Sequence, residues 1–250
     1  MRIQKFLASK GHGSRREVER WVKEGRLKIN GKKAQIGDAV KGDELFFLDS
    51  QRLYVNPKKL SHQHIIYNKN NDEICSRSDP DYKKSVFDSL PKIRSMRWVM
   101  VGRLDVSTTG LLLFTTDGEL ANRLMHPSYE IIRHYAVRIY GHPSKNDIIS
   151  LLKGVELDDG PAAFISVKKK ASGMANVWYE VTLAEGRKHE VKRLWEAVGF
   201  KVNKLIRLGY GEVTLPKSLR RGSHQKLSAD EIKRVYQSVK LTDESISKNK

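Results

Sequence analysis

The residues most able to do chemistry lie in the segment GRLDVSTTGLLLFTTDGELANRL, residues 102–124. A short apolar run before it, Val99 to Val101, is predicted to be a buried strand that leads Asp105 into a polar loop. A second predicted buried strand, Leu111 to Phe114, follows the loop. A carboxylate held between two core strands is rigidly placed yet accessible, which is what a carboxylate nucleophile needs. On spacing alone, the alternative is that Asp105 caps a turn and pairs with Arg103.

The rest of the chain up to about residue 240 alternates between strand and helix patterns. Apolar residues occupy every second position in residues 135–139 and 177–183, which is typical of half-buried strands. The spacing becomes helical at Val191, Leu194, Trp195 and Val198. Many strands with few helices predict an α+β domain, which we assign to residues 65–240. Residues 241–250 are predicted to be a disordered tail.

Residues 1–55 are predicted to form a separate small module. Its second helix is expected to begin after Ser14, because Glu17 completes a capping box and an apolar stripe follows. Asn30-Gly31 is a hairpin signal between two short strand patterns, and residues 45–48 are predicted to close the module as a strand. Residues 56–64 are polar and basic without periodicity, which predicts a linker.

One face of this second helix, together with the hairpin beside it, is basic. The residues that share this positive surface are Arg15, Arg16, Arg20, Lys23, Arg26 and Lys28. Several cations on one surface can contact the phosphates of a structured RNA, in which shape and backbone are what a protein can recognise. For a run of charges alone, the alternative is an ordinary solvated helix face.

The whole chain is strongly basic. Its 250 residues contain 47 Lys and Arg against 29 Asp and Glu, a formal net charge of +18. A charge of this size attracts polyanions and favours phosphate contacts, so a nucleic acid is the expected partner and a membrane surface the lesser alternative. Hydrophobic residues make up 39% of the chain, which is enough for a packed core.

Several other classes of protein are disfavoured. The single cysteine, Cys75, excludes a disulfide framework and a cysteine-rich zinc site. The eight histidines show no ligand spacing, so we expect no metal site, and His126, His134 and His189 are interpreted as RNA-facing or structural residues. The amino terminus MRIQKFLASKGHG is interrupted by charges, unlike a secretory signal, and no apolar run is long enough to span a bilayer. A reducing, cytoplasmic setting is therefore expected.

The order of residues in the amino-terminal module resembles the S4 RNA-binding domain. The matching features are SRRE at the start of the second helix, the hairpin GRLKING, and the later pair Gly42-Asp43. This resemblance implies RNA binding. It implies no particular chemistry, because S4 domains occur in ribosomal proteins, synthetases and modifying enzymes alike.

The segment GRLDVSTTGLLLFTTDG resembles the signature of the ribosomal RNA pseudouridine synthases that carry an amino-terminal S4 domain. In that family the aspartate of GRLD is catalytic, which implies a catalytic role for Asp105. Residues 133–141, RHYAVRIYG, are similar to the strand whose aromatic residue packs against the target base, which implies Tyr135. The alternative for Tyr135 is a core tyrosine that faces inward. Residues 185–199, EGRKHEVKRLWEAVG, are similar to a basic helix whose arginine or lysine pairs with the catalytic aspartate, which implies Lys192.

The same segments contain further cations that we expect to contact RNA. These are Arg103, Arg187, Lys188 and Arg193. Lys188 and Lys192 are four residues apart and share a helix face. The alternative is therefore that both simply contact RNA phosphates.

The runs VFDSLP, RWVMVGRLD, DGELANRLMHPS and DGPAA are most similar to the B-type subgroup, which modifies large-subunit ribosomal RNA. The resemblance implies a single uridine of 23S rRNA near the peptidyl-transferase centre as target. It also implies a mixed, mainly antiparallel sheet with flanking helices, no cofactor, and an isomerase that transfers uracil within the RNA. We expect the protein to be a monomer.

Two other functions remain open at this point. The first is a non-catalytic RNA-binding or ribosome-assembly factor that uses only the S4 module. The second is a different RNA-acting enzyme such as a methyltransferase, although no glycine-rich cofactor loop follows a predicted strand.

Overall fold

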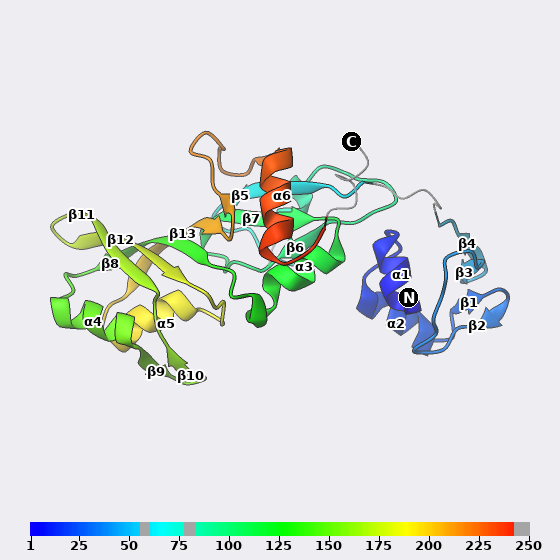
Figure 1. Ribbon diagram of the computed structural model, residues 1–250, viewed down its shortest axis with the longest axis horizontal. Coiled ribbons are helices and arrows are strands. Elements are labelled where there is room, and N and C mark those ends of the chain that lie inside the picture. The colour runs from blue at the N-terminus through cyan, green and yellow to red at the C-terminus, as the bar shows by residue number, and fades with distance from the viewer. Residues whose placement is uncertain (56–60, 78–83, 243–250) are drawn as a thin grey trace. The chain divides into compact units, whose positions relative to one another are not determined.

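The computed structural model describes residues 1–55, 61–77 and 84–242 (Figure 1). The chain divides into two compact units, each of which is described by itself. The first comprises Met1–Gln63, Pro91–Val99 and Thr116–Gly118, and the second comprises His64–Leu90, Met100–Thr115 and Glu119–Lys250. Residues 56–60 of the predicted linker and 243–250 of the predicted tail lie outside the described residues. Those two boundaries therefore remain predictions.

The first unit contains two helices and a four-stranded sheet. Its elements are α1 (Ile3–Ser9), α2 (Arg15–Lys23), β1 (Leu27–Ile29), β2 (Lys32–Lys33), β3 (Phe46–Leu48) and β4 (Gln51–Leu53), with strand order β2-β1-β3-β4. One hydrophobic cluster joins helices and sheet, and its members include Ile3, Leu7, Val18, Leu27 and Phe46. The helices are short, so this shared core stabilises them more than their own helix propensity does.

Local signals in the sequence account for most of this unit. The Ser14 hydroxyl accepts the Glu17 N–H at 3.1 Å and the Glu17 carboxylate accepts the Ser14 N–H at 3.1 Å, which confirms the capping box. Asn30-Gly31 forms the predicted hairpin turn, with positive φ angles of 48° and 85°. Strand β4 was not predicted, because its short polar sequence shows no alternation. It forms because the turn at Asp49-Ser50 folds the chain back onto β3.

The second unit is built on a nine-stranded mixed sheet. Its strands are β5 (His64–Lys69), β6 (Val99–Val101), β7 (Thr109–Thr115), β8 (Arg133–Tyr140), β11 (Ser166–Ser172), β12 (Asn176–Leu183), β13 (Val202–Tyr210), β14 (Val213–Thr214) and β15 (His224–Lys226). The order is β11-β12-β8-β13-β7-β5-β15, with β14 paired to β13 and β6 to β7. Strands β7 and β13 run parallel, whereas the neighbouring pairs β12–β8, β8–β13 and β5–β7 are antiparallel. The predicted α+β class is confirmed.

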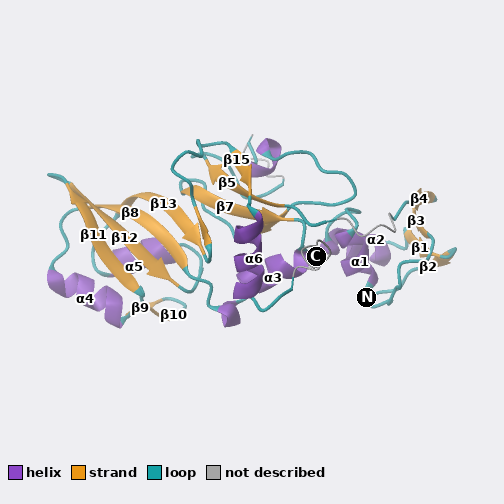
Figure 2. Cartoon of the chain, turned by 45° about the horizontal axis from the view of Figure 1, so that its top comes forward, coloured by secondary structure: helices purple, strands orange, loops and turns teal. Residues whose placement is uncertain are grey.

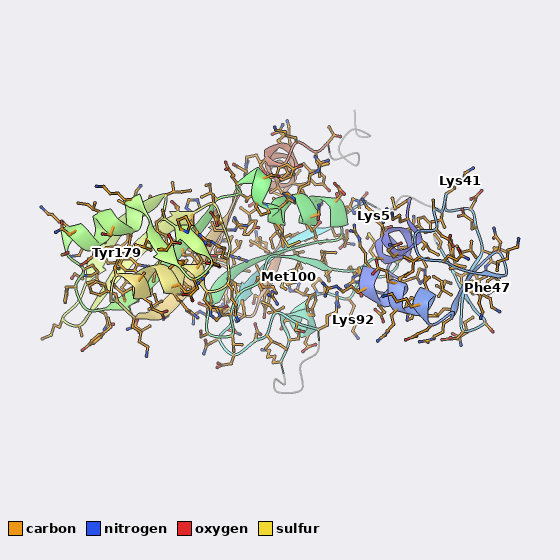
Figure 3. All side chains as sticks on the ribbon, turned by 90° about the horizontal axis from the view of Figure 1, so that it is seen from below. Lys5, Lys41, Phe47, Lys92, Met100 and Tyr179 are labelled. Atoms are coloured by element: carbon orange, nitrogen blue, oxygen red, sulfur yellow. The ribbon has the colours of Figure 1, made fainter. Side chains whose placement is uncertain are left out.

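The remaining elements flank this sheet. They are α3 (Gly118–Met125), α4 (Lys145–Lys153), α5 (Glu190–Ala197), α6 (Ala229–Ser238), the hairpin β9 (Val155–Leu157) and β10 (Gly160–Ala162), and the single turns η1 (Val86–Ser89) and η2 (Pro127–Tyr129). Helices α4 and α5 lie on one face of β11, β12 and β8 (Figures 1 and 2). The side chains that β8 and β12 send to this face are buried. Tyr179, labelled in Figure 3, has its ring 5.0 Å from that of Trp195 on α5.

The alternating patterns predicted for β8 and β12 are confirmed by their burial. The predicted buried strand Leu111 to Phe114 is also confirmed, because every residue of β7 is buried. The prediction was wrong for part of β6: Val101 is buried, but Val99 and Met100 (labelled in Figure 3) are only half-buried. Strand β6 pairs with β7 outside the main strand order, so it is covered on fewer sides.

Candidate active site

Asp105 lies on the loop that joins β6 to β7, as the sequence predicted. Its side chain is 32% exposed, so it is accessible to a ligand without being fully solvated. The Thr108 N–H donates to the Asp105 carbonyl at 3.1 Å and closes a turn immediately after it. The polar loop is therefore compact, and strand β7 begins at the next residue, Thr109.

A buried lysine at the end of β5 fixes this loop. Lys69 has no exposed surface, and its ammonium group donates to the carbonyl oxygens of Asn70 at 2.9 Å, Val106 at 2.9 Å and Thr108 at 3.0 Å. Burial lowers the pKa of Lys69 below its ordinary value. On the other side of Asp105, the Leu104 N–H donates to the Cys75 sulfur at 3.4 Å. The backbone is thus held both before and after the carboxylate.

The sequence analysis did not identify Lys69 as part of the site. The signal was present, because a lysine closes the otherwise buried strand HIIYNK, and a buried cation must find hydrogen-bond acceptors. Two of its acceptors, the carbonyls of Val106 and Thr108, are 37 and 39 residues further along the chain. The sequence pattern does not indicate which residues so far away would accept these hydrogen bonds.

Gly110 allows β7 to approach β13 closely just after the loop. Its φ angle is +101°, and a Cβ at this position would lie 2.3 Å from the carbonyl oxygen of Arg207 and 2.8 Å from its nitrogen. No side chain fits there. Arg207 is itself buried, and its Nε donates to the carbonyl oxygen of Leu111 at 2.8 Å. These contacts join the Asp105 loop to the centre of the sheet.

The start of α5 supplies two groups that contact the Asp105 carboxylate, Lys192 in its first turn and His189 directly before it, and the Thr108 hydroxyl also donates to Oδ2 at 3.5 Å. Lys192 Nζ donates to Oδ2 at 2.9 Å, and it also lies 3.3 Å from the Ser107 hydroxyl. His189 Nε2 lies 3.2 Å from the other oxygen, Oδ1. The predicted neighbour Lys192 is therefore brought to Asp105. The alternative partner Arg103 is exposed and is not among the contacts of Asp105 in the described part of the chain.

From its sequence context, His189 was expected only to face RNA or to be structural. Its backbone has φ +54°, a left-handed conformation that is uncommon for a non-glycine residue, directly before α5. The spacing of three residues between His189 and Lys192 puts both on one side of the first helical turn. That spacing was the signal in the sequence that would have suggested a shared carboxylate.

Tyr135 lies on β8 and is buried, on the face of the sheet that α5 covers. Arg207 of β13 is its register partner and is also the register partner of Gly110 on β7. Tyr135 therefore lies two strands from the end of the Asp105 loop, in the same row of the sheet. It is not among the hydrogen-bond or ion-pair partners that the described residues give to Asp105.

The cations of α5 and the segment before it differ in their surroundings. Arg193 holds both carboxylate oxygens of Asp159, at 2.8 Å and 3.0 Å. This contact keeps the pKa of Asp159 below its ordinary value. The Arg187 guanidinium also donates to Asp159, with Nη1 3.1 Å from Oδ1. The backbone N–H of Arg187 donates to the buried carboxylate of Glu190 at 2.9 Å. Lys188 is exposed.

The six basic residues predicted for RNA contact in the first unit also differ in their exposure and in their ion-pair partners. Arg15, Arg16 and Lys23 are exposed on α2. Arg20 is exposed and lies 3.9 Å from Glu24, while Lys28 is half-buried on β1. Arg26 binds Asp49 through Nε at 2.8 Å and Glu24 through Nη1 at 3.0 Å, and these partners raise the pKa of the guanidinium.

The described residues contain no group of three or more His, Cys, Asp or Glu side chains that could hold a metal ion. The helices in that part of the chain are all too short or too polar to cross a membrane.

Comparison with protein-family models matches residues 63–197 to the family described as RNA pseudouridylate synthase. A second match assigns residues 1–45 to the S4 domain. The chain belongs to the RNA pseudouridylate synthase family.

Several relatives of this pseudouridine synthase match along almost the whole chain. The ribosomal large subunit pseudouridine synthase B of Yersinia pestis is 48% identical, over 99% of this chain and 79% of that protein. The proteins of the same name in Salmonella typhimurium and Escherichia coli K12 are each 47% identical, over 99% of this chain and 86% of theirs. A crystal structure of a pseudouridylate synthase matches with a TM-score of 0.65 and 27% identity, covering 94% of this chain and 99% of that one.

These matches confirm three expectations from the sequence. The pseudouridine synthase is an isomerase that acts on RNA, its amino-terminal module is an S4 domain, and its larger unit has the mixed-sheet fold of the family.

Proposed function

We propose that this pseudouridine synthase converts one uridine of 23S rRNA, near the peptidyl-transferase centre, to pseudouridine, with Asp105 as the catalytic carboxylate. The choice of RNA is supported by the names of relatives that match nearly the whole chain, all large-subunit synthases. The catalytic assignment is carried by one observation. The accessible Asp105 carboxylate is held at 2.9 Å by Lys192 and lies 3.2 Å from His189.

The reaction breaks the N1–C1′ glycosidic bond, turns the uracil, and rejoins it to C1′ through C5. The proton on C5 is lost to water and N1 gains one, so the product is an isomer of the substrate. Neither oxidation nor an energy source is required. The target uridine must leave its stack to enter the site, which costs a few kcal/mol that RNA backbone contacts and stacking offset.

In this proposal Asp105 acts as an anion aimed at the flipped nucleotide. Attack on the sugar, attack on the base, and removal of a sugar proton all require an ionised and oriented carboxylate. The ammonium of Lys192 donates to Oδ2 at 2.9 Å and orients the carboxylate. His189 orients the second oxygen. Lys69 keeps the loop from shifting when RNA binds, because it holds carbonyls on the loop itself.

Tyr135 is proposed to pack its ring against the target uracil. It shares a sheet row with Gly110, the second residue of β7 after the Asp105 loop, and it lies on the α5 side with Lys192. Base stacking on an aromatic side chain contributes about 1–3 kcal/mol. Its burial is compatible with this role if one edge of the ring meets the base.

The proposed RNA contacts are of two kinds. The exposed cations Arg15, Arg16, Lys23, Arg103 and Lys188 are available to phosphates directly. Arg20, Arg26, Arg187 and Arg193 already face carboxylates, so an RNA contact there would have to share or displace an existing partner. With ribosomal RNA as substrate, as a stem-loop or an assembly intermediate, the proposed place of action is the cytoplasm, and we expect a monomer.

The test is tritium release from 23S rRNA that carries tritium at C5 of uracil. The wild-type protein should release tritium, and Asp105→Asn should lower the rate by roughly 10³-fold or more. Glu156→Gln is the matched control, since it neutralises an exposed carboxylate on β9 and should leave the rate unchanged.

Three outcomes would contradict parts of the proposal. Wild-type protein that binds the RNA and releases no tritium would favour the non-catalytic RNA-binding function. Equal release by wild type and Asp105→Asn would remove Asp105 from the chemistry and leave the reaction intact. Mapping the product by carbodiimide adducts and primer extension identifies the uridine, and a product outside 23S rRNA would overturn the proposed target.

A further inference from the structure

The larger unit has a second basic surface, on the face of the sheet opposite α5. Side chains alternate along a strand, so the neighbours of the buried Tyr179 and Val137 point the other way. These neighbours include Trp178 on β12 and Arg138 on β8, and both are only half-buried. Figures 1 and 2 show α4 and α5 on the other side of these strands.

Trp178 is at the centre of this surface and lies beneath two cations. The guanidinium carbon of Arg138 lies 5.8 Å from the ring centroid, and Nζ of Lys204 lies 6.0 Å from it. All three residues are in one row, because Arg138 is the register partner of Trp178 on β12 and of Lys204 on β13. Arg138 is also oriented by Asn203, whose side-chain oxygen accepts its Nε–H at 2.8 Å.

Two further lysines come from the edge strand β11. Lys168 is the register partner of Glu180, two residues from Trp178, so it points to the same face. Lys170 lies at a bulge and pairs with Glu180 at 3.2 Å. We call the set Arg138, Lys168, Lys170, Trp178 and Lys204 the outer sheet face. The neighbouring carboxylate, Glu180, is already paired with one of these lysines.

We propose that the outer sheet face is a second RNA-binding surface, which holds a single-stranded stretch of the substrate RNA outside the active site. The inference rests on the proposed function only for the identity of the RNA. Cations around an aromatic ring suit a nucleic acid strand, because the cations contact phosphates while a base stacks on the ring. Trp178 is half-buried and the groups over its ring are the cations Arg138 and Lys204, which suits a polyanion better than a protein or membrane contact.

This surface is distinct from the active site. Tyr135 and Tyr179 point from the same strands to the face that α5 covers, where Lys192 reaches Asp105. An RNA segment on the outer sheet face is therefore a different segment from the one that contains the target uridine. Loss of the outer contact should weaken RNA binding and leave the rate at saturating RNA unchanged.

Lysine footprinting tests the proposal on the intact protein. An amine-reactive reagent is applied with and without protein-free 23S rRNA, and separately with an oligouridine of about 12 nucleotides, a length within the usual site sizes for single strands. Lys168, Lys170 and Lys204 should be labelled at least severalfold more slowly when RNA is bound. The exposed Lys145 and Lys153 on α4 serve as internal controls and should be labelled at unchanged rates.

Variants provide a second, quantitative test. The double variant Arg138→Ala/Lys204→Ala removes two phosphate contacts, so the slope of log K against log salt should fall by about 1.4 for single-stranded RNA. Lys145→Ala/Lys153→Ala removes the same charge from the helix side and should leave the slope unchanged. Trp178→Leu should weaken binding by about fivefold or more, while Trp178→Phe should retain most of it, because the phenyl ring still stacks.

The outcomes separate this proposal from the proposed function. If the wild-type protein releases tritium but RNA does not protect the lysines of the outer sheet face from labelling, the proposed second RNA-binding surface is overturned. The assignment as an enzyme then still stands. Protection without any tritium release supports the surface while the proposed reaction fails. Protection with ribosomal particles and none with protein-free RNA would assign the face to a protein partner, and would also overturn the proposal.

Discussion

Helices α2 and α5 both carry clusters of arginine and lysine, but the two clusters have different surroundings. On α2, Arg15, Arg16 and Lys23 are exposed, and the described residues provide them with no ion-pair partner. On α5, Arg193 forms an ion pair with Asp159, and Lys192 forms one with Asp105. The same residue types are left for solvent or phosphate on one helix, whereas on the other they hold carboxylates of the chain itself.

This difference follows from what lies beside each helix. An exposed lysine or arginine can exchange water and counterions for a phosphate, which gives salt-dependent binding. A cation already in a charge-assisted hydrogen bond must first give up that bond. Substitutions on α2 are therefore expected to change RNA affinity, and substitutions on α5 to change the rate at saturating RNA.

Among the residues of α2 and α5, the largest effect is expected at Lys192. Lys192→Ala should lower kcat by about 10²–10³-fold with little change in KM, because Asp105 loses the ammonium group that orients its carboxylate. Lys192→Arg should recover much of the rate, since it retains a permanent positive charge. Single-turnover tritium release measures both. An unchanged kcat with a raised KM would instead place Lys192 among the RNA-contacting cations.

Lys69→Met should lower kcat by about 10²-fold, although Lys69 does not contact Asp105. The variant removes the donor that holds the Val106 and Thr108 carbonyls, and a small displacement of a reacting group reduces rates by about this factor. RNA affinity should be unchanged. Wild-type kinetics in this variant would show that the loop holds its shape without the buried ammonium.

The same variant has a pH signature. Burial lowers the folded-state pKa of Lys69, so between that value and about 10.5 the unfolded chain binds more protons than the folded chain. The contribution of Lys69 to the free energy of unfolding is therefore complete above pH 10.5 and is lost as pH falls through the folded pKa. Urea denaturation of wild type and Lys69→Met from pH 8 to 10.5 should show a difference that grows with pH. A difference independent of pH would contradict the shift.

On α2, the triple variant Arg15→Ala/Arg16→Ala/Lys23→Ala should weaken RNA binding about tenfold and leave kcat unchanged. If all three contact phosphates of duplex RNA, the slope of log K against log salt should fall by about 2–3. The control replaces three exposed lysines of the larger unit, Lys145, Lys153 and Lys233, with alanine. If the two triple variants have equal slopes of log K against log salt, α2 contributes to RNA binding only through the net charge of the protein and not through specific phosphate contacts.

A smaller effect is expected at His189. His189→Ala should lower kcat about fivefold, because an exposed hydrogen bond to a carboxylate is lost while Lys192 remains. His189→Asn should lose a similar amount, because asparagine tolerates φ +54° but is too short to reach Asp105. Full activity of both variants would mean that the contact between His189 and Asp105 makes no contribution to catalysis.

The smallest kinetic effect is expected at Arg193. Arg193→Ala should lower kcat by about two- to threefold and leave the salt slope of RNA binding unchanged, because its partner is Asp159 rather than a phosphate. If the slope falls by about one unit, Arg193 has exchanged Asp159 for the RNA in the complex. The contrast between α2 and α5 would then be limited to the free protein.

Short-range signals in the sequence determined much of this protein. The capping box at Ser14, the turn at Asn30-Gly31 and the alternation in β8 and β12 are each encoded within a few residues, so periodicity and turn chemistry identify them. The position of Asp105 on a loop between two strands is local in the same sense. These signals also predicted the fold class, whereas the RNA-binding module was identified by its resemblance to the S4 domain.

Only the tertiary structure decided which groups surround Asp105. His189 and Lys192 are 84 and 87 residues further along the chain, and Lys69, which fixes the loop, reaches it across 37 and 39 residues. Contacts of this kind depend on how β5, β7 and β13 pair and where α5 packs, and periodicity does not state strand order or register. For the same reason, the sequence could not distinguish the arginines that hold Asp159 from the cations of α2 that remain exposed.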